Sequence, residues 1–254
     1  MKEIAFELPP VVSRTEWLAA RKALLQREKD ATHARDALSA ERRRLPLVEI
    51  DKDYVFEGLT GALRLADLFE GRRQLIVYHF MFLREQGQGC PGCSLFADNV
   101  PHLSHLRAHH TAFALVSRAP LAEIETFRQR LGWTLPWYSS FGSDFNYDFH
   151  ATTDAAVKPV EYNYRDQAEL ERLGQTYHIQ GEQPGLSVFL QDGGRVFHSY
   201  STYGRGLDLF INIYNLLDTT PFGRGEGRDG MADLGVEMRH HDRYDEPAPN
   251  CCEH

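Results

Sequence analysis

Two short runs of apolar residues, 75–82 and 111–117, have the length and the β-branched and aromatic content of strands buried on both faces. A helical pattern follows each run, at residues 94–103 and 121–131. Alternating strands and helices predict a parallel sheet with right-handed crossovers. Residues 186–203 then predict an antiparallel hairpin that turns at Asp192-Gly-Gly194, and residues 207–217 a last amphipathic helix.

The longest helical pattern covers residues 14–44, which contain no Gly or Pro. Ser13 and Glu16 match a capping box at its start, and Pro46 ends it. Its apolar stripe repeats every seven residues from Trp17 but is narrow and rich in alanine. Because so little apolar area cannot stabilise an isolated helix, we expect it to lie against the domain or against a partner subunit, as in a homodimer.

Between this helix and the first core strand, residues 48–69 read as an edge hairpin with a turn at 58–61, leading into a short helical turn. The patterns therefore divide the chain into an N-terminal extension with the long helix (1–46), an α/β domain (47–220) and a tail (221–254). The tail is rich in Gly, Asp and Arg, so we expect it to be loosely ordered.

The motif Cys90-Pro91-Gly92-Cys93 lies between the first core strand and its helix. Two intervening residues place both sulfurs on one helical turn, and a helix N-terminus stabilises a thiolate through its free N–H groups and dipole. The motif predicts thiol–disulfide chemistry, with Cys90 as the exposed nucleophile and Cys93 as the resolving thiol. A zinc site, which would need a second ligand pair, and a purely structural pair are the alternatives.

Two further side chains are candidates for this chemistry. The strand before the motif offers no acid, and its titratable side chains are Tyr78 and His79. His79 is a candidate base, or else an inert core histidine. Arg118 follows the second strand at the edge where open sheets keep their sites. It could lower the pKa of Cys90, bind an acidic substrate, or be an ordinary surface arginine.

Composition narrows the classes of function. The net charge of -8 argues against nucleic acid as a partner, and no run of 18 apolar residues predicts a membrane span. The first 30 residues lack the pattern of a signal peptide, so we expect a cytoplasmic protein. In that compartment four cysteines are too few for a disulfide framework, and a C-x-x-C is more often catalytic or metal-binding. We expect no cofactor and no resident metal.

The order of strand, C-x-x-C, helix, strand, helix, Pro and hairpin is similar to that of the thioredoxin fold. Pro184 stands where that fold keeps a cis-proline opposite the two sulfurs, and Gln183 beside it is a candidate for substrate binding. Residues 116–121, 132–137 and 139–149, with 78–82 and 200–203, resemble the thioredoxin-like family catalogued as domain of unknown function 899. The resemblance covers residues 18–244 and implies a redoxin-type mixed sheet flanked by helices, without an established activity.

The chain departs from two better-known relatives of this fold. Thioredoxins place Trp-Cys-Gly-Pro-Cys directly after the strand, whereas here residues 83–89 intervene, Gly89 replaces the Trp, and Pro and Gly exchange order. Peroxiredoxins carry Pro-x-x-x-Thr-x-x-Cys, and here Leu83 and Gly87 occupy the Pro and Thr positions. Peroxidase activity of that type is therefore not expected.

Three functional hypotheses follow. The leading one is a thiol–disulfide oxidoreductase that acts on a disulfide-containing protein or a small thiol substrate. The second is a redoxin that handles copper or zinc through the cysteines and a histidine such as His178. The third is a non-enzymatic binding protein that uses a cleft or the long helix for its partners.

Overall fold

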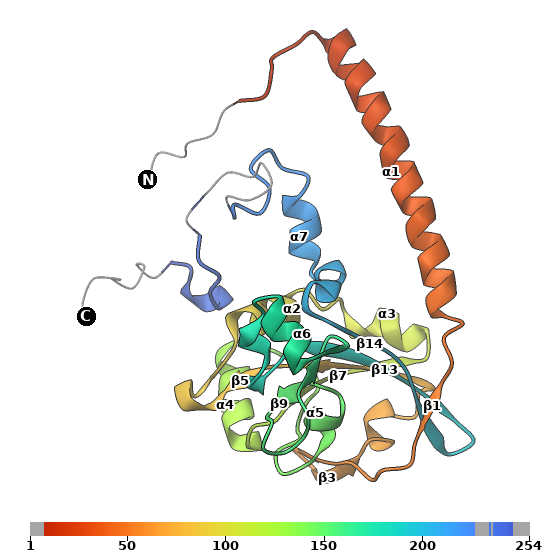
Figure 1. Ribbon diagram of the computed structural model, residues 1–254, viewed down its shortest axis with the longest axis vertical. Coiled ribbons are helices and arrows are strands. Elements are labelled where there is room, and N and C mark those ends of the chain that lie inside the picture. Colours follow the sequence, from red (N-terminus) through yellow and green to blue (C-terminus); the bar gives the residue numbers. More distant parts are fainter. Residues whose placement is uncertain (1–7, 227–233, 235, 246–254) are drawn as a thin grey trace, which may run out of the picture.

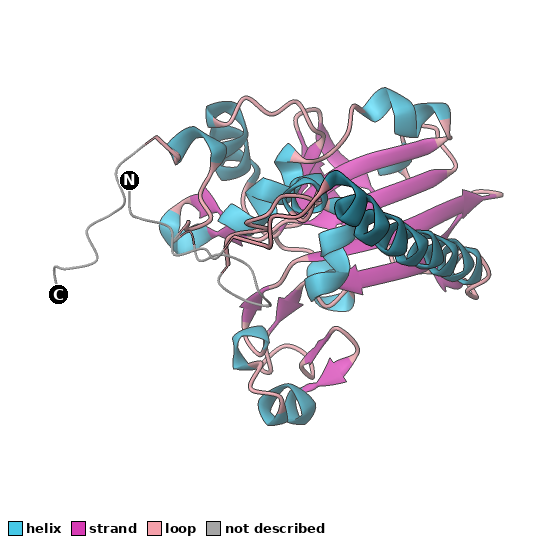
Figure 2. Ribbon diagram, turned by 90° about the horizontal axis from the view of Figure 1, so that it is seen from above, coloured by secondary structure: helices cyan, strands magenta, loops and turns pink. Residues whose placement is uncertain are grey.

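An eight-stranded sheet forms the centre of the computed structural model, which describes residues 8–226, 234 and 236–245. Its strand order is β1-β14-β13-β4-β7-β8-β2-β3, with β4, β7 and β8 parallel and β13 antiparallel to both β4 and β14 (Figures 1 and 2). The strand before the C-x-x-C motif, its parallel neighbour and the antiparallel hairpin on its other side make the fold thioredoxin-like. The strands of this sheet are β1 (Val48–Ile50), β2 (Val55–Gly58), β3 (Gly61–Arg64), β4 (Gln74–His79), β7 (Thr111–Ser117), β8 (Trp137–Ser139), β13 (Gly185–Asp192) and β14 (Arg195–Tyr203).

Side chains alternate along the central strands and divide the core into two layers. On β4, Ile76 and Tyr78 face one layer, whereas Leu75, Val77 and His79 are directed to the other. The first layer is covered by α2 (Pro91–Asp98), α3 (Leu103–Ala108) and α4 (Leu121–Arg130), and the second by the 3-10 helix Asp67–Phe69 and α5 (Phe145–Asp148). The cysteines and the first layer therefore share one face of the sheet.

Residues 149–182 form a small substructure beside the end of β13. Its own apolar cluster contains Val160, Tyr162 and Leu170, and Tyr203 of β14 closes it. Its elements are β9 (Thr152–Thr153), β10 (Glu161–Tyr162), β11 (Arg165–Asp166), α6 (Gln167–Arg172), the 3-10 helix Thr176–His178 and β12 (Gly181–Glu182).

The helix predicted to follow the C-x-x-C motif begins at the motif, as expected, but is interrupted before residue 103. α2 starts at Pro91 with Cys90 as its N-cap and ends at Asp98. Pro101 cannot continue a helix, so the chain restarts as α3 with His102 as the N-cap. The Asn99 side chain stabilises the break, because its amide donates to the Leu95 carbonyl at 2.7 Å and its oxygen accepts from Ile213 N–H at 2.8 Å.

The last predicted helix, residues 207–217, is also two elements: a 3-10 helix, Gly204–Phe210, and α7 (Asn212–Leu217). Ile211 between them has an open backbone with φ -98° and ψ 88°. This geometry lets both Leu207 and Ile211 enter the first core layer. The apolar stripe that predicted one helix is thus buried by two shorter elements.

The predicted edge hairpin is correct for β2 and β3 but not for residues 48–50. β1 pairs with β14 at one edge of the sheet, whereas β2 pairs with β3 and β8 at the other. Between them Lys52 binds Asp144 at 2.6 Å and Asp148 at 2.8 Å. Residues 48–56, which the sequence pattern joins in one strand of a hairpin, thus form two strands at opposite edges of the sheet.

The predicted cis bond between Gln183 and Pro184 is wrong, since no peptide bond among the described residues is cis. The chain reaches Pro184 as an extension of β12, and Gln183 N–H donates to the Ala151 carbonyl at 2.9 Å. On the other side, the Pro184 carbonyl accepts from the Tyr162 hydroxyl at 2.9 Å. These two bonds hold an extended path into β13.

The long helix α1 (Arg14–Arg42) is present with the predicted capping box of Ser13 and Glu16. It projects away from the sheet, and none of its residues is buried (Figure 1). Near its end, the Arg42 guanidinium lies 4.9 Å from the centre of the Tyr200 ring. The structure therefore does not show packing along the domain, and contact with a partner subunit stays a prediction.

The C-terminal region is partly ordered against the domain. Residues 236–245 lie beside α2 and α4, and His240 among them is only 3% exposed. The prediction of a loose tail is thus not met by these residues. Cys251 and Cys252 lie outside the described residues. Across the described part of the chain, the search for a helix long and apolar enough to span a bilayer finds none.

Because α1 contributes nothing to either core layer, removing residues 1–44 should change the free energy of unfolding of the domain by less than about 1 kcal/mol. Chemical denaturation of the full and shortened chains measures this. Leu75→Ala is the positive control, since Leu75 is fully buried and its truncation should cost about 2–5 kcal/mol. A loss of several kcal/mol on removal of α1 would mean that the helix is stabilised by packing that the isolated chain does not show.

Candidate active site

The two cysteines lie at the start of α2, as the sequence predicts. Cys90 is the N-cap and Cys93 the third helical residue, and both are free thiols. Their side chains are within hydrogen-bonding contact of each other. Cys90 is partly exposed, whereas Cys93 is buried with 2% of its surface accessible. The two thiols therefore lie next to each other at the start of α2.

The surroundings separate the two thiols chemically. A hydrogen bond from the Cys93 thiol lowers the pKa of Cys90 to about 6, against the penalty of partial burial and with help from the backbone N–H groups of Gly92 and Cys93. Burial raises the pKa of Cys93 well above its usual value, and contact with Cys90 adds to the rise. The surroundings therefore favour the thiolate at Cys90 and the protonated thiol at Cys93.

Tyr78 is the polar side chain of β4 that reaches the cysteines. Its ring stacks on Phe96 of α2 with centroids 3.7 Å apart, and its hydroxyl is hydrogen-bonded to Cys93. Burial raises the pKa of Tyr78 far above its usual range, so the hydroxyl remains a donor. Met81 N–H also donates to the Cys93 sulfur, at 3.4 Å. Both donors favour a negative charge on Cys93 when it forms.

A small cavity of about 150 Å³ opens beside the thiols. Pro184 lines it together with Leu207, Ile211 and Tyr214. The pairing of β13 with β4, which aligns Gly185 with His79, brings Pro184 to the end of β4 where the cysteine loop begins. The cavity is therefore a space in which a group bound to Cys90 can be held against Pro184.

His79 lies on the opposite face of the sheet from the cysteines, so the structure does not bring the predicted base to them. Its ring stacks on Phe145 and Phe149, and Nε2 is 2.9 Å from Ser187 Oγ. Desolvation lowers the pKa of His79 to about 3 and keeps the ring neutral. The alternative reading, an inert core histidine, fits this environment.

Arg118 lies at the carboxyl end of β7, as expected, but pairs with another partner. Its guanidinium is 3.4 Å from Glu182 Oε1 and stacks over the Tyr147 ring at 4.9 Å. Glu182 also accepts from Thr152 Oγ1 at 2.8 Å. The largest effect on the pKa of Cys90 comes from Cys93 instead. Arg118 thus stabilises the segment that leads to Pro184.

Gln183 is buried, with 1% of its surface exposed, and both polar atoms of its side chain are hydrogen-bonded within the 149–182 substructure. Oε1 is 2.7 Å from His178 Nδ1, and Nε2 donates to the Tyr177 carbonyl at 3.4 Å. His178 in turn stacks on Tyr162. Within residues 8–226, 234 and 236–245, no three His, Cys, Asp or Glu side chains gather in a way that would hold a metal ion. The described part of the chain gives the metal hypothesis no ligand set.

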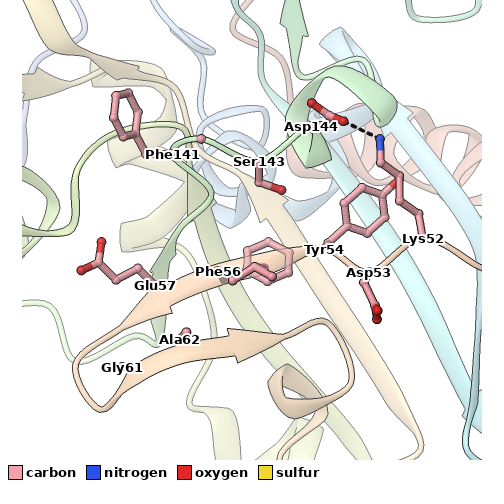
Figure 3. Close-up of a pocket in the computed structure, with 12 residues that line it drawn as sticks. Lys52, Asp53, Tyr54, Phe56, Glu57, Gly61, Ala62, Phe141, Ser143 and Asp144 are labelled. Atoms are coloured by element: carbon pink, nitrogen blue, oxygen red, sulfur yellow. Dashed lines mark hydrogen bonds and ion pairs between the residues drawn. The ribbon is translucent and has the colours of Figure 1, made fainter.

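A larger cavity, about 580 Å³, lies elsewhere, between the β2–β3 hairpin and residues 141–144 (Figure 3). Lys52 is its cationic group, but that amine is bound by Asp144. The cavity contains no cysteine or histidine and is an open hollow on the edge of the sheet. We therefore place the candidate site at the smaller cavity, where the reactive groups are.

Comparison with known families gives one match. The family model described as "Bacterial protein of unknown function (DUF899)" matches residues 6–244, which is nearly the whole chain. No curated protein matches the chain.

Solved structures with related folds include peroxiredoxins at low similarity. A cysteine-to-serine mutant of Xylella fastidiosa PrxQ is 12% identical, with 68% of this chain and 94% of that chain covered and a TM-score of 0.41. The Xanthomonas campestris bacterioferritin comigratory protein is 12% identical, with coverages of 66% and 96% and a TM-score of 0.40. Peroxidoxin BcpB from Mycobacterium tuberculosis is 13% identical, with coverages of 66% and 94% and a TM-score of 0.37.

Gly89, where thioredoxins have Trp, should tolerate no side chain. A Cβ there would lie 2.6 Å from Phe80 and 2.8 Å from Phe127, both in the packed core. Gly89→Ala should therefore lower the free energy of unfolding by about 1–3 kcal/mol. Gly92→Ala is the matched control, because its Cβ would meet Met238 at 3.5 Å and Cys90 at 3.8 Å, which are ordinary contacts. Equal stability of both variants in denaturation would contradict the argument.

The buried neutral His79 should make the protein less stable in mild acid. Its folded-state pKa of about 3 lies below the unfolded value of 6.5, so the unfolded chain binds the extra proton between these limits. Stability is thus complete above about pH 6.5 and is lost as the pH falls. Between about pH 7.5 and pH 5 this one group should contribute about 2 kcal/mol of loss.

His79→Leu tests this prediction, because it removes the titrating group from the same apolar environment. Denaturation of both proteins at the two pH values should show a smaller pH-dependent loss in the variant. An unchanged difference would show that His79 is charged or exposed in the folded protein.

Proposed function

The chain belongs to the DUF899 family, and from the geometry at α2 we propose that it is a thiol–disulfide oxidoreductase that uses Cys90 and Cys93. The observation that carries this proposal is the contact between a partly exposed Cys90 with a lowered pKa and a buried, protonated Cys93. An attacking thiol needs to be ionised near ambient pH and accessible, and a resolving thiol needs to be close but protected. The two cysteines meet these separate requirements.

The reduction of a disulfide would proceed in two balanced steps. The Cys90 thiolate attacks one sulfur of the substrate, the substrate S–S bond breaks, and the departing thiolate takes a proton from solvent. Cys93 then attacks the Cys90 sulfur, which releases the second substrate thiolate, and the proton of Cys93 goes to this leaving group. The protein dithiol has become a disulfide, and a thiol or dithiol reductant must restore it.

Tyr78 takes the place that the sequence suggested for His79. Its hydroxyl and Met81 N–H donate to the Cys93 sulfur and stabilise the charge that develops as Cys93 loses its proton. Since the pKa of Tyr78 is raised, the tyrosine acts as a hydrogen-bond donor rather than as a base. We propose the predicted roles for Cys90 and Cys93, a trans Pro184 that lines the cavity beside them, and support of the Pro184 segment by Arg118 and Gln183.

The Cys90 thiolate should titrate with a midpoint near pH 6, measured by its ultraviolet absorbance. Cys93→Ala should move this midpoint toward the ordinary value of 9.0, because it removes the donor that lowers the pKa most. Cys93→Ser, which keeps an O–H donor at the same place, should move it less. A midpoint that ignores residue 93 would show that the two side chains are not in contact in solution.

Exchange with a small disulfide, followed by mass spectrometry, tests the reaction itself. Cys90→Ser should abolish turnover, and Cys93→Ser should accumulate the mixed disulfide on Cys90. Full turnover in Cys90→Ser, or faster alkylation of Cys93 than of Cys90, would show that the roles are assigned wrongly. Two unreactive thiols in a protein that instead forms a stable complex would favour the non-enzymatic hypothesis.

A further inference from the structure

The segment of residues 236–245, which we call the C-terminal strap, lies against the start of α2. Its His241 is 2.8 Å from Asp98 at the end of α2, and its Asp242 pairs with Arg130 of α4 at 3.2 Å. The sulfur of Met238 lies next to Gly92, on the side where a Cβ would also meet the Cys90 sulfur. The strap therefore reaches the C-x-x-C motif from a part of the chain more than a hundred residues away.

His240 makes the most buried contact of the strap. Its ring is 3% exposed and packs edge-on against Phe127, with centroids 5.2 Å apart. Arg130 Nη2 lies 2.8 Å from Nδ1, and the Gly89 carbonyl lies 2.8 Å from Nε2. A guanidinium can only donate, so Nδ1 accepts and the ring proton is on Nε2, which donates to Gly89. Both ring nitrogens are satisfied by one neutral tautomer.

The Gly89 carbonyl belongs to the peptide group that leads directly into Cys90. The other polar group of this peptide, the Cys90 N–H, donates to the Met81 carbonyl at 3.0 Å. The two hydrogen bonds fix both polar groups of the Gly89–Cys90 peptide and so fix its plane. His240 is the donor to this buried carbonyl, so removing the imidazole takes away the bond that holds one side of the peptide and lets it turn toward another donor.

We propose that His240 is a positioning residue for Cys90, which holds the Gly89–Cys90 peptide so that the thiol keeps its place at the start of α2. Its role in catalysis rests on the proposed function of the cysteine pair. Rotation of this peptide would take the Cys90 sulfur away from the Cys93 thiol and from the N–H groups of Gly92 and Cys93. These are the groups that stabilise the thiolate.

His240→Ala tests the proposal through the titration of Cys90 in the full chain. The variant should raise the Cys90 midpoint by about one pH unit, which lowers the rate of alkylation near pH 6 roughly fivefold. His240→Gln should restore values within about twofold of the native rate, because the glutamine amide can donate from the position of Nε2. His241→Ala is the matched control, since it removes a strap contact to Asp98 without touching Gly89, and it should leave the titration unchanged.

Three outcomes would overturn the proposal: an unchanged titration in His240→Ala, equal shifts in His240→Ala and His241→Ala, or no restoration by glutamine. Nitrogen NMR of the native protein adds a test that needs no variant, so that poor folding of His240→Ala would leave the question decidable. The ring of His240 should show the neutral tautomer with the proton on Nε2. A proton on Nδ1 would contradict the assigned contacts with Arg130 and Gly89.

The failure of this inference can be told apart from the failure of the proposed function. Titration and alkylation report the position of Cys90 whether or not the pair exchanges with disulfides. If the His240 variants shift the Cys90 titration as expected but the protein exchanges with no disulfide, the oxidoreductase proposal alone is wrong. Disulfide exchange that is indifferent to His240 would remove the positioning role alone.

Discussion

Alternation of side chains along β4 is the constraint on which the site depends. Successive residues of a strand point to opposite faces, so Tyr78 and His79 cannot both face α2. The strand delivers Tyr78 to the cysteines and His79 to the aromatic layer of Phe145 and Phe149. This choice gives the buried thiol a neutral hydroxyl donor, and it confines the imidazole to a place where a positive charge is costly.

Side chains of the core, not of the C-x-x-C motif, fill the space beside the cysteine loop. Phe80 and Phe127 occupy the place where a side chain at residue 89 would stand, and Trp137 packs on Phe80 with centroids 4.5 Å apart. The loop can therefore lie this close to the core only because residue 89 is glycine. The strap is the outer counterpart of this packing, since His240 lies against the same Phe127 and binds the carbonyl of the same glycine.

Most of the fold could be predicted from the sequence because its signals are local. The strand over residues 111–117, the capping box of α1, the hairpin of β13 and β14 and the start of α2 each follow from short-range pattern and end chemistry. The interruption at Ile211 has no local signal, because the apolar positions Leu207 and Ile211 have the spacing of one continuous helix. Residues 48–50 pair with β14 at one edge of the sheet and residues 55–58 with β3 at the other. A hairpin pattern in the sequence does not indicate that its first strand is divided in this way.

The sequence predicted that Cys90, Cys93 and Pro184 come together, although not that the bond before Pro184 is trans. Which face Tyr78 and His79 would take depends on the direction in which α2 packs, and a continuous apolar run gives no sign of it. Arg118 and Gln183 lie at the expected positions in the chain. However, Arg118 pairs with Glu182, and Gln183 is hydrogen-bonded to His178. The strap was not predicted, because the Gly-rich composition of the tail suggests disorder. Its contact with Gly89 also joins residues 151 positions apart in the sequence, so no local pattern indicates it.

The unequal acidity of the two thiols also determines how many protons accompany electron transfer. Between the two thiol pKa values the reduced pair holds one proton, so forming the disulfide releases two electrons but a single proton. The midpoint potential of such a couple changes by about 30 mV per pH unit, half the slope of a pair in which both thiols are protonated. In the proposed exchange, the potential of the pair would therefore change with pH by half as much as that of an ordinary dithiol.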